Sequence, residues 1–255
     1  MKRPVIAIIQ ARMSSTRLPS KVMKPICGRP IIWHVVNRLK ASELIDEVVI
    51  ATTTEPSDDV IAEWCGLNGT SFFRGSLNDV LDRYFKAAKE FGARTVVRVT
   101  SDCPLIDPAL VDRAIARFSE GGFDHVSIDG SFPDGLDAEV ISIEALEKAH
   151  REAALASERE HVTPYIWKNP RLFRLDRIKS PADLSRMRWT VDDAKDLEFV
   201  TRVFEGVGSE KVFHYEDVLS FLENNPELLK INSETARNEG YAKSLKEDRV
   251  VKKTA

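Results

Sequence analysis

The chain has little cysteine and no long apolar run. Its three cysteines, Cys27, Cys65 and Cys103, lie far apart among 255 residues and form no CxxC pair. This spacing argues against a disulfide framework and against a zinc site, and it suits a reducing cytoplasm. The longest uninterrupted apolar stretch, VIAII at residues 5–9, is too short to cross a membrane. The N-terminal segment MKRPVIAIIQAR lacks the apolar run and cleavage site of a signal peptide, so we expect a cytoplasmic protein.

The chain also lacks an excess of positive charge and the common nucleotide-binding signatures. Its net charge is −3 and its pI is about 6.0, which gives no overall basic surface for nucleic acid. It contains neither GxGxxG nor GxxxxGK[ST], so it carries neither the dinucleotide fingerprint nor the P-loop. No histidine has a spaced nucleophile, which leaves a Ser/His/Asp or Cys/His mechanism without support. Any site for a polyanion must therefore be local.

Buried strands and amphipathic helices alternate along the first half of the chain. The all-apolar run at residues 5–9 predicts a strand that is buried on both faces. Further strands are predicted at 47–52, 72–73 and 95–101, and helices at 30–40, 57–66, 76–91 and 108–119. This βαβα order predicts an α/β fold with a mostly parallel, doubly wound sheet.

The second half of the chain is less regular. Strands are predicted at 124–128, 137–143 and 189–191, helices at 143–152, 157–168, 195–205 and about 217–225, and a half-exposed strand at 171–178. We expect one α/β domain at 1–210, with an inserted subregion at about 125–185, and a C-terminal helical extension at 211–255. Beyond residue 237 the chain is polar, and we expect its end to be frayed.

The loop after the first strand is a candidate phosphate site, because open α/β sheets bind ligands at the carboxyl ends of their strands. It reads QARMSSTRLPSK at 10–21 and contains Arg12, Arg17 and Lys21 together with several hydroxyl side chains. Guanidinium and ammonium groups with short donors suit a polyphosphate. On charge alone, a solvated basic loop is an equal alternative, and the position after a buried strand favours the functional one.

Carboxylates follow three other predicted strands. Asp102 stands at a strand end and could hold Mg²⁺, or it could cap a turn before a proline. Of Asp192 and Asp193, we expect one to be a metal ligand and the other to cap the next helix. Asp137 and Glu139 would share one face of a strand, where they could bind hydroxyls, an amine or a cation, or form a solvated edge.

These segments together resemble a known family. QARMSSTRLPSK, SDCPLIDP and VDD are similar to the CTP-dependent cytidylyltransferases that make CMP-sugars, which include the 3-deoxy-manno-octulosonate and acylneuraminate enzymes. FRGSLNDVLDRYFKAA, FPDGLDAEV, EREHVTPYI and RNEGYAKSLKED are most similar to the spore coat polysaccharide biosynthesis protein F group. The resemblance implies a three-layer α/β/α sandwich of the nucleotide-diphosphosugar transferase type, which is Rossmann-like. It also implies an inserted hairpin near 170–180 that builds a homodimer.

The resemblance also implies an activity and a set of site residues. The activity is Mg²⁺-dependent transfer of CMP from CTP to a sugar acid or related acceptor, with release of pyrophosphate, for surface polysaccharide or glycan synthesis. Arg12, Lys21 and Asp102 would be catalytic, and Asp102 and Asp192 would hold the metal. Nucleotide contacts would come from Ala11, Arg12, Ser15, Arg17, Lys21, Thr52 and Arg74, and acceptor contacts from Asp137, Glu139, His161 and Thr163.

One departure from the family, and two alternatives, remain open. The acidic pair Asp137 and Glu139 predicts an acceptor that presents hydroxyls or an amine to them instead of a bare carboxylate. A glycosyltransferase on the same fold is one alternative, although the chain has no convincing DxD metal motif and more cations in the first loop than a diphosphate needs. A non-catalytic nucleotide-binding protein is the other, and the retained phosphate and metal residues weigh against it.

Overall fold

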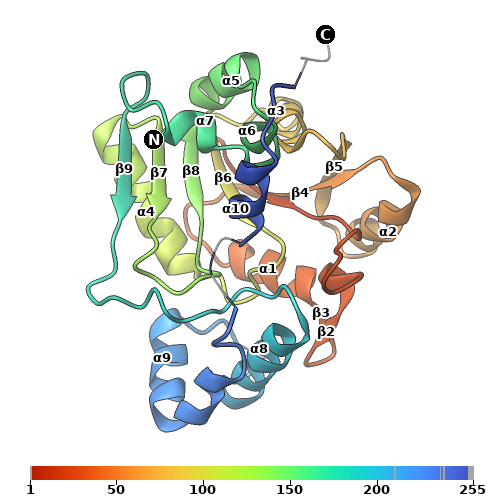
Figure 1. Ribbon diagram of the computed structural model, residues 1–255, viewed down its shortest axis with the longest axis vertical. Helices are drawn as coiled ribbons and strands as arrows, with labels where there is room; N and C mark the ends of the chain where they lie inside the picture. Colours follow the sequence, from red (N-terminus) through yellow and green to blue (C-terminus); the bar gives the residue numbers. More distant parts are fainter. Residues whose placement is uncertain (1, 210, 236, 238, 252–255) are drawn as a thin grey trace.

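The computed structural model describes residues 2–209, 211–235, 237 and 239–251, and they form a three-layer α/β/α sandwich (Figure 1). In this part of the chain the central sheet has seven strands in the order β5-β4-β1-β6-β8-β7-β9. The strands are β1 (Val5–Gln10), β4 (Glu47–Thr53), β5 (Ser71–Gly75), β6 (Thr95–Thr100), β7 (His125–Ile128), β8 (Glu139–Ser142) and β9 (Leu175–Ile178). All neighbouring pairs are parallel except those that involve β8, so the predicted mostly parallel sheet is confirmed.

Strand β1 lies inside the sheet, where it pairs with β4 on one side and with β6 on the other. Ile8 lies opposite Val49 and Arg98 in this register. The carboxyl ends of these parallel strands meet at one edge, so the loop after Gln10 and the turn after Thr100 come together there. A short ribbon of β2 (Pro25–Ile26) and β3 (Arg29–Pro30) and the 3₁₀ turn η1 (Lys21–Met23) follow that loop.

Two hydrophobic cores cover the two faces of the sheet. Alternate residues of β1 divide between them, with Val5, Ala7 and Ile9 on one face and Ile6 and Ile8 on the other. The first core includes α1 (Ile31–Lys40), α2 (Asp59–Leu67), α4 (Pro108–Gly121), α8 (Ala194–Val207) and α9 (Tyr215–Asn224). The second includes α3 (Val80–Glu90), α5 (Ile143–Glu152) and α7 (Pro164–Trp167).

Two of the helix predictions are wrong. Helix α3 begins at Val80 instead of at residue 76, because Asp79 is the N-cap and accepts a hydrogen bond from the amide of Asp82. The helix predicted at 157–168 is two helices, α6 (Ala156–His161) and α7. Val162 between them has φ of +72°, and Pro164 then begins α7 at the position where its missing N–H costs nothing.

The inserted region also differs from the prediction. The half-exposed strand predicted at 171–178 is confirmed in part as β9, an edge strand parallel to β7, and the hairpin that the resemblance implies near 170–180 is not formed. The return strand predicted at 189–191 is not regular, and the chain there makes an isolated bridge between Asp134 and Arg188. Gly135 allows the close approach, since it has φ of +106° and a Cβ on it would lie 2.5 Å from the amide nitrogen of Thr190.

Most of the C-terminal segment that we expected to be frayed is folded, and residues 252–255 at its end lie outside the described residues. After the 3₁₀ turn η3 (Pro226–Lys230), helix α10 (Glu239–Lys246) packs on α6 beside the carboxyl edge of the sheet (Figure 1). The amide of Ala156 donates to the carbonyl of Arg249, and the amide of Val251 donates to the carbonyl of Ala154, both at 2.8 Å. Asp248 accepts from both the amide and the hydroxyl of Ser157. We call residues 248–251 the C-terminal strap.

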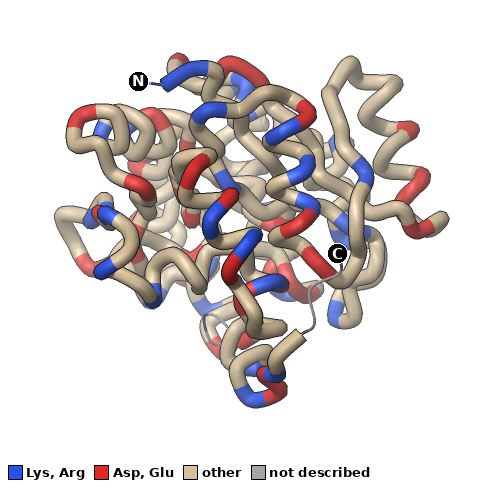
Figure 2. Tube along the Cα trace, turned by 90° about the horizontal axis from the view of Figure 1, so that it is seen from above, with Lys and Arg blue, Asp and Glu red and all other residues tan. Residues whose placement is uncertain are grey.

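The helices and the charged residues each have one general property. Among the described residues, no helix combines the length and the apolar character that a bilayer span requires. Lys and Arg residues are interspersed with Asp and Glu residues along the trace, and neither kind is confined to one side (Figure 2). The division into a domain at 1–210, an inserted subregion at about 125–185 and a C-terminal extension at 211–255 stays a prediction. One further short element, the 3₁₀ turn η2 (Pro56–Asp58), precedes α2.

Candidate active site

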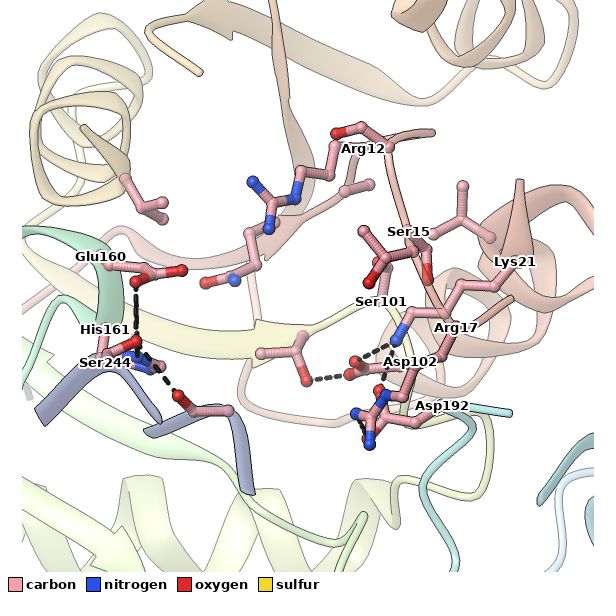
Figure 3. Close-up of a pocket in the computed structure, with 18 of the residues that line it drawn as sticks. Arg12, Ser15, Arg17, Lys21, Ser101, Asp102, Glu160, His161, Asp192 and Ser244 are labelled. Atoms are coloured by element: carbon pink, nitrogen blue, oxygen red, sulfur yellow. Dashed lines mark hydrogen bonds and ion pairs between the residues drawn. The ribbon is translucent and has the colours of Figure 1, made fainter. Parts of the chain in front are cut away.

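A cleft of about 630 Å³ opens at the carboxyl edge of the sheet, where the sequence predicts a phosphate site (Figure 3). It is lined by residues of the β1 loop, of β6 and the turn after it, and of α3, α6 and α10. They are Gln10, Ala11, Arg12, Ser14, Ser15, Thr16, Arg17, Lys21, Val22, Val80, Arg83, Thr100, Ser101, Asp102, Glu160, His161, Asp192, Glu239, Gly240, Lys243, Ser244 and Glu247. The structure therefore brings together eight of the predicted site residues, namely Ala11, Arg12, Ser15, Arg17, Lys21, Asp102, His161 and Asp192.

The β1 loop is held in place from the other side by Asp58. This buried carboxylate accepts hydrogen bonds from the amide of Met13 at 2.8 Å and from the hydroxyl of Thr53. The loop then turns back through Ser20, whose amide donates to the carbonyl of Met13 and whose φ is +59°. As a result, Arg12 extends into the cleft (Figure 3), and no ion pair joins it to any other described residue.

Lys21 joins the two carboxylates that were predicted to hold a metal. Its ammonium donates to Asp102 and to Asp192 at 2.8 Å each, and also to the carbonyl of Val191 at 3.1 Å. Burial acts to lower the pKa of Lys21, but the two carboxylates outweigh it and raise that pKa above its ordinary value. Burial acts to raise the pKa of Asp102, and the Lys21 ammonium with the hydroxyl of Thr100 brings it down to about 2.

Of the neighbouring residues Asp192 and Asp193, one caps a helix, as the sequence predicts. Asp193 caps α8, where its side chain accepts from the amide of Asp196 at 2.9 Å. Asp192 faces the cleft and is also contacted by Arg188 at 2.8 Å and by Arg17 at 2.9 Å. The capping role of Asp193 is confirmed, and the metal role of Asp192 stays a prediction.

Asp102 and Asp192 fit a divalent cation of the Mg²⁺ type. Such an ion takes one or two carboxylates and completes its coordination with phosphate oxygens and water. The carboxylates already share one positive charge, that of Lys21, so they lie close enough to share another. No group of three or more His, Cys, Asp or Glu side chains gathers for a metal among the residues the structure describes. This chemistry therefore suits a metal that arrives with a nucleotide.

Arg83 is a cleft residue that the sequence analysis missed. Its side chain is 1 % exposed, its Nη1 donates to the carbonyl of Ser76 at 2.6 Å, and its Nε is buried without a described partner. Burial lowers its pKa, and the guanidinium of Arg12 lowers it further. In the sequence this arginine is one polar position of an amphipathic helix, so no motif marks it.

The structure does not bring five of the predicted residues into the lining of the cleft. Thr52 is fully buried with an unpartnered hydroxyl, and Arg74 pairs with Asp59 at 2.7 Å beside the second strand. Asp137 lies before β8 and binds Arg237 at 2.6 Å. The remaining two are Glu139 and Thr163. The functional roles of these residues stay predictions.

Glu139 belongs to a buried charge network, and of the expected acidic pair only Glu139 lies within β8, which begins at that residue. Arg98 contacts Glu139 at 2.6 Å and His125 contacts it at 2.9 Å, and Thr163 also hydrogen bonds to it. Burial acts to raise the pKa of Glu139, but Arg98 and His125 lower it to about 2. The carboxylate of Glu139 is thus satisfied by protein groups, whereas Asp137 pairs with Arg237.

His161 lies on the far side of the cleft, where α6 meets α10. Its Nε2 is 3.0 Å from the hydroxyl of Ser244, which in turn donates to Glu160 at 2.8 Å (Figure 3). Burial lowers the pKa of His161, and Arg98 lowers it further. A neutral imidazole that donates from Nε2 to the serine oxygen satisfies this chain of contacts.

The comparisons with known proteins agree with this geometry. The sequence profile of the family described as "Cytidylyltransferase" matches residues 6–231. The chain belongs to this family. Cytidylyltransferases are nucleotidyltransferases that use CTP, and the chain shares their enzyme class.

Two relatives and one solved structure show how far the similarity extends. The chain is 32 % identical to the spore coat polysaccharide biosynthesis protein SpsF of Bacillus subtilis, over 88 % of this chain and 95 % of that protein. It is 39 % identical to a 3-deoxy-manno-octulosonate cytidylyltransferase of Geobacter sulfurreducens, over 46 % of each chain. A cytidylyltransferase structure from Leptospira borgpetersenii has a TM-score of 0.84 at 34 % identity and covers 91 % of this chain and 98 % of its own.

Proposed function

We propose that this cytidylyltransferase transfers CMP from CTP to a small sugar-type acceptor with release of pyrophosphate, for surface polysaccharide or glycan synthesis. The observation that carries the proposal is the pairing of cations and carboxylates at one end of the cleft. Arg12 extends into the cleft without an ion pair among the described residues, and in the same lining Lys21 joins Asp102 and Asp192. A triphosphate with a divalent cation is complementary to this set, since it brings both negative oxygens and a positive ion.

The residues present suggest a mechanism of positioning and charge neutralisation. An oxygen of the acceptor forms a bond to the α-phosphorus as the bond from that phosphorus to the bridging oxygen breaks, and pyrophosphate leaves. Arg12 and Lys21 hold the phosphates and neutralise the charge that develops on the leaving group. Asp102 and Asp192 would hold Mg²⁺, which supplies Lewis-acid stabilisation of the phosphate oxygens when bound. The acceptor proton passes to solvent or to a phosphate oxygen.

Calorimetric and thermal-shift titrations test the nucleotide part of the proposal. The protein is titrated with CTP, UTP, ATP, GTP and a UDP-sugar, each with and without Mg²⁺. We expect CTP with Mg²⁺ to raise the melting temperature most, because a ligand that binds only the folded state stabilises it by mass action. A preference for the UDP-sugar would instead support a glycosyltransferase, and the absence of nucleotide binding would support a non-catalytic role.

The expected homodimer has a candidate surface at the edge of the sheet. Strand β9 pairs with β7 on one side only, and Leu172 next to it is 52 % exposed. An unpaired strand edge with a neighbouring apolar side chain suits association with a second copy. We propose this edge for the dimer, and light scattering of Leu172→Glu against the unaltered protein tests it, with a monomeric variant as the expected result.

A further inference from the structure

Helix α10 forms one wall of the active-site cleft, although it lies near the end of the chain. Glu239, Gly240, Lys243, Ser244 and Glu247 from this segment all line the cleft. Ser244 lies beside the α6 residues Glu160 and His161, on the opposite side of the cleft from Lys21 and Asp102 (Figure 3). The C-terminal segment is therefore part of the substrate-binding surface.

The wall is held at both of its ends. At its start, Glu239 pairs with Arg17 at 2.8 Å, and the same guanidinium reaches Asp192 at 2.9 Å. At its end, the C-terminal strap bonds to the residues that begin α6. In the middle, Tyr241 packs edge-on against His161, with ring centroids 5.0 Å apart. These contacts fix α10 over the cleft instead of leaving it as a free tail.

The two sides of the cleft differ in charge. The β1 loop, η1 and α3 contribute the cations Arg12, Arg17, Lys21 and Arg83. The same side also holds the carboxylates of Asp102 and Asp192, which pair with Lys21. The α6 and α10 side contributes the carboxylates of Glu160, Glu239 and Glu247 and one ammonium, that of Lys243. Because Glu239 pairs with Arg17, the carboxylates of Glu160 and Glu247 exceed that ammonium by one charge. The triphosphate belongs on the first side, so the second side is left for another part of the substrates.

The nucleoside part of CTP fits the first side better than the second. A pyrimidine base needs an apolar or planar surface, and the apolar side chains of the lining are those of Ala11, Val22 and Val80, with the planar guanidinium of Arg83 three residues after Val80 on α3. No apolar side chain of the lining comes from α6 or α10, and the planar imidazole of His161 on α6 already contacts Ser244 and Tyr241. The wall made by α6 and α10 is polar, with hydroxyl, carboxylate, imidazole and ammonium groups that suit a polyhydroxy ligand.

We infer that α10 and α6 form the acceptor subsite, and that it takes a neutral or amine-bearing polyhydroxy compound instead of a sugar acid. Ser244 and His161 offer hydrogen bonds to hydroxyls, and Glu247 and Glu160 attract an amine or accept from hydroxyls. An acceptor carboxylate on this side would meet like charge that one ammonium does not balance. The inference rests on the proposed function and assigns the acceptor to residues other than Asp137 and Glu139.

The first arm of the test measures CTP binding with Mg²⁺ by calorimetry in the unaltered protein and in Ser244→Ala, Lys243→Met and Lys246→Met. Lys246→Met is the matched control, because it makes the same change on the same helix at a residue outside the lining. We expect the same affinity in all four proteins. Absence of CTP binding in the unaltered protein would overturn the proposed function itself, and weaker CTP binding in Ser244→Ala and Lys243→Met alone would overturn the acceptor assignment.

The second arm measures pyrophosphate release with CTP, Mg²⁺ and two panels of acceptor. One panel holds glucosamine, N-acetylglucosamine and a neutral alditol, and the other holds glucuronate and 3-deoxy-manno-octulosonate. We expect activity with the first panel. We also expect the acceptor KM of Ser244→Ala to be at least about fivefold higher than that of the unaltered protein, which is the factor that the loss of one hydrogen bond produces. Lys246→Met should match the unaltered protein.

Three results of the second arm would overturn the inference while leaving the proposed function intact. The first is turnover of the sugar acids in preference to the neutral and amino sugars. The second is CTP binding without turnover of either panel. The third is an acceptor KM that rises in Asp137→Asn and stays unchanged in Ser244→Ala and Lys243→Met, which would return the acceptor to the residues that the sequence predicts.

Discussion

Asp102 and Asp192, from opposite halves of the chain, accept hydrogen bonds from one ammonium group, that of Lys21, at 2.8 Å each. The lysine thus occupies a position between the two carboxylates that were predicted to bind a metal. A divalent cation that approaches the same oxygens must share them with the ammonium or displace it. CTP offers the ammonium other partners, since its phosphates carry negative oxygens, so nucleotide and metal are expected to bind together.

Lys21→Met should bind Mg²⁺ or Mn²⁺ more tightly than the unaltered protein when no nucleotide is present. Removal of the ammonium leaves two carboxylates without their shared counter-charge, and a divalent cation restores it. Calorimetric titration with Mn²⁺ measures the difference, which we expect to be about tenfold in Kd. Lys24→Met is the control, because Lys24 lies three residues on and does not line the cleft. Equal metal affinity in the two variants would show that Lys21 does not shield a metal site.

Arg12→Ala should lower turnover with CTP by about 10²- to 10³-fold and leave the melting temperature unchanged. The first effect follows from the loss of a phosphate-binding guanidinium. The second follows from the position of Arg12, which is exposed in the cleft and pairs with no described residue. Arg17→Ala is a useful contrast, since Arg17 also pairs with Asp192 and Glu239. An unchanged rate in Arg12→Ala would exclude the phosphate-binding role.

The part of the site on the first strand could be predicted from the sequence because it depends on local order. A buried apolar run followed by a basic loop places Arg12 and Lys21 at the carboxyl edge of any parallel sheet, and Asp102 follows the neighbouring strand by the same rule. A helix cap at Asp192 or Asp193 could also be predicted, because an aspartate directly before a helix is a common N-cap, and Asp193 is the one that caps α8. These inferences needed only the strand order and the chain direction.

The other part depends on contacts that no local pattern encodes. The partners of Glu139 come from β6 and β7, and no local pattern in the sequence shows that this carboxylate is buried and paired. The tail is polar, so the sequence predicts a frayed end. Its order depends on α6, against which α10 and the C-terminal strap pack. Arg83 needed the position of its helix relative to the β1 loop before its place in the cleft became visible.

Arg83→Met should weaken CTP binding by about tenfold or more, which is the value of a hydrogen bond to a charged group. The buried Nε of Arg83 has no described hydrogen-bond partner, and the nearby Arg12 carries like charge. A negatively charged oxygen of the nucleotide would accept hydrogen bonds from both guanidinium groups. The measurement is the calorimetric Kd for CTP with Mg²⁺.

Arg38→Met is the control for Arg83→Met. Arg38 is equally buried and holds the carbonyl oxygens of Ile106 and Phe213, but it does not line the cleft. It should lose stability and keep its affinity for CTP. If both variants keep that affinity, Arg83 has a structural role only.

Glu139→Gln should destabilise the fold by about 3 kcal/mol at neutral pH, because it leaves the buried guanidinium of Arg98 without its counter-charge. Glu144→Gln, which removes a half-exposed partner of Lys2, should cost less than about 1 kcal/mol. The folded-state pKa of Glu139 is lowered to about 2 from an ordinary 4.5. Its contribution is therefore complete above pH 4.5 and is lost as the pH falls from there towards 2.

Urea unfolding at pH 7 and pH 3 measures this contribution directly. The difference in unfolding free energy between the unaltered protein and Glu139→Gln should shrink at pH 3, since the carboxylate of the unfolded chain is protonated there and part of the linkage is gone. The same comparison for Glu144→Gln should change little, because that carboxylate is largely exposed to water. A Glu139→Gln difference that is small at pH 7 would show that Arg98 finds sufficient compensation from its other neighbour, Gln10, which lies 3.4 Å from it.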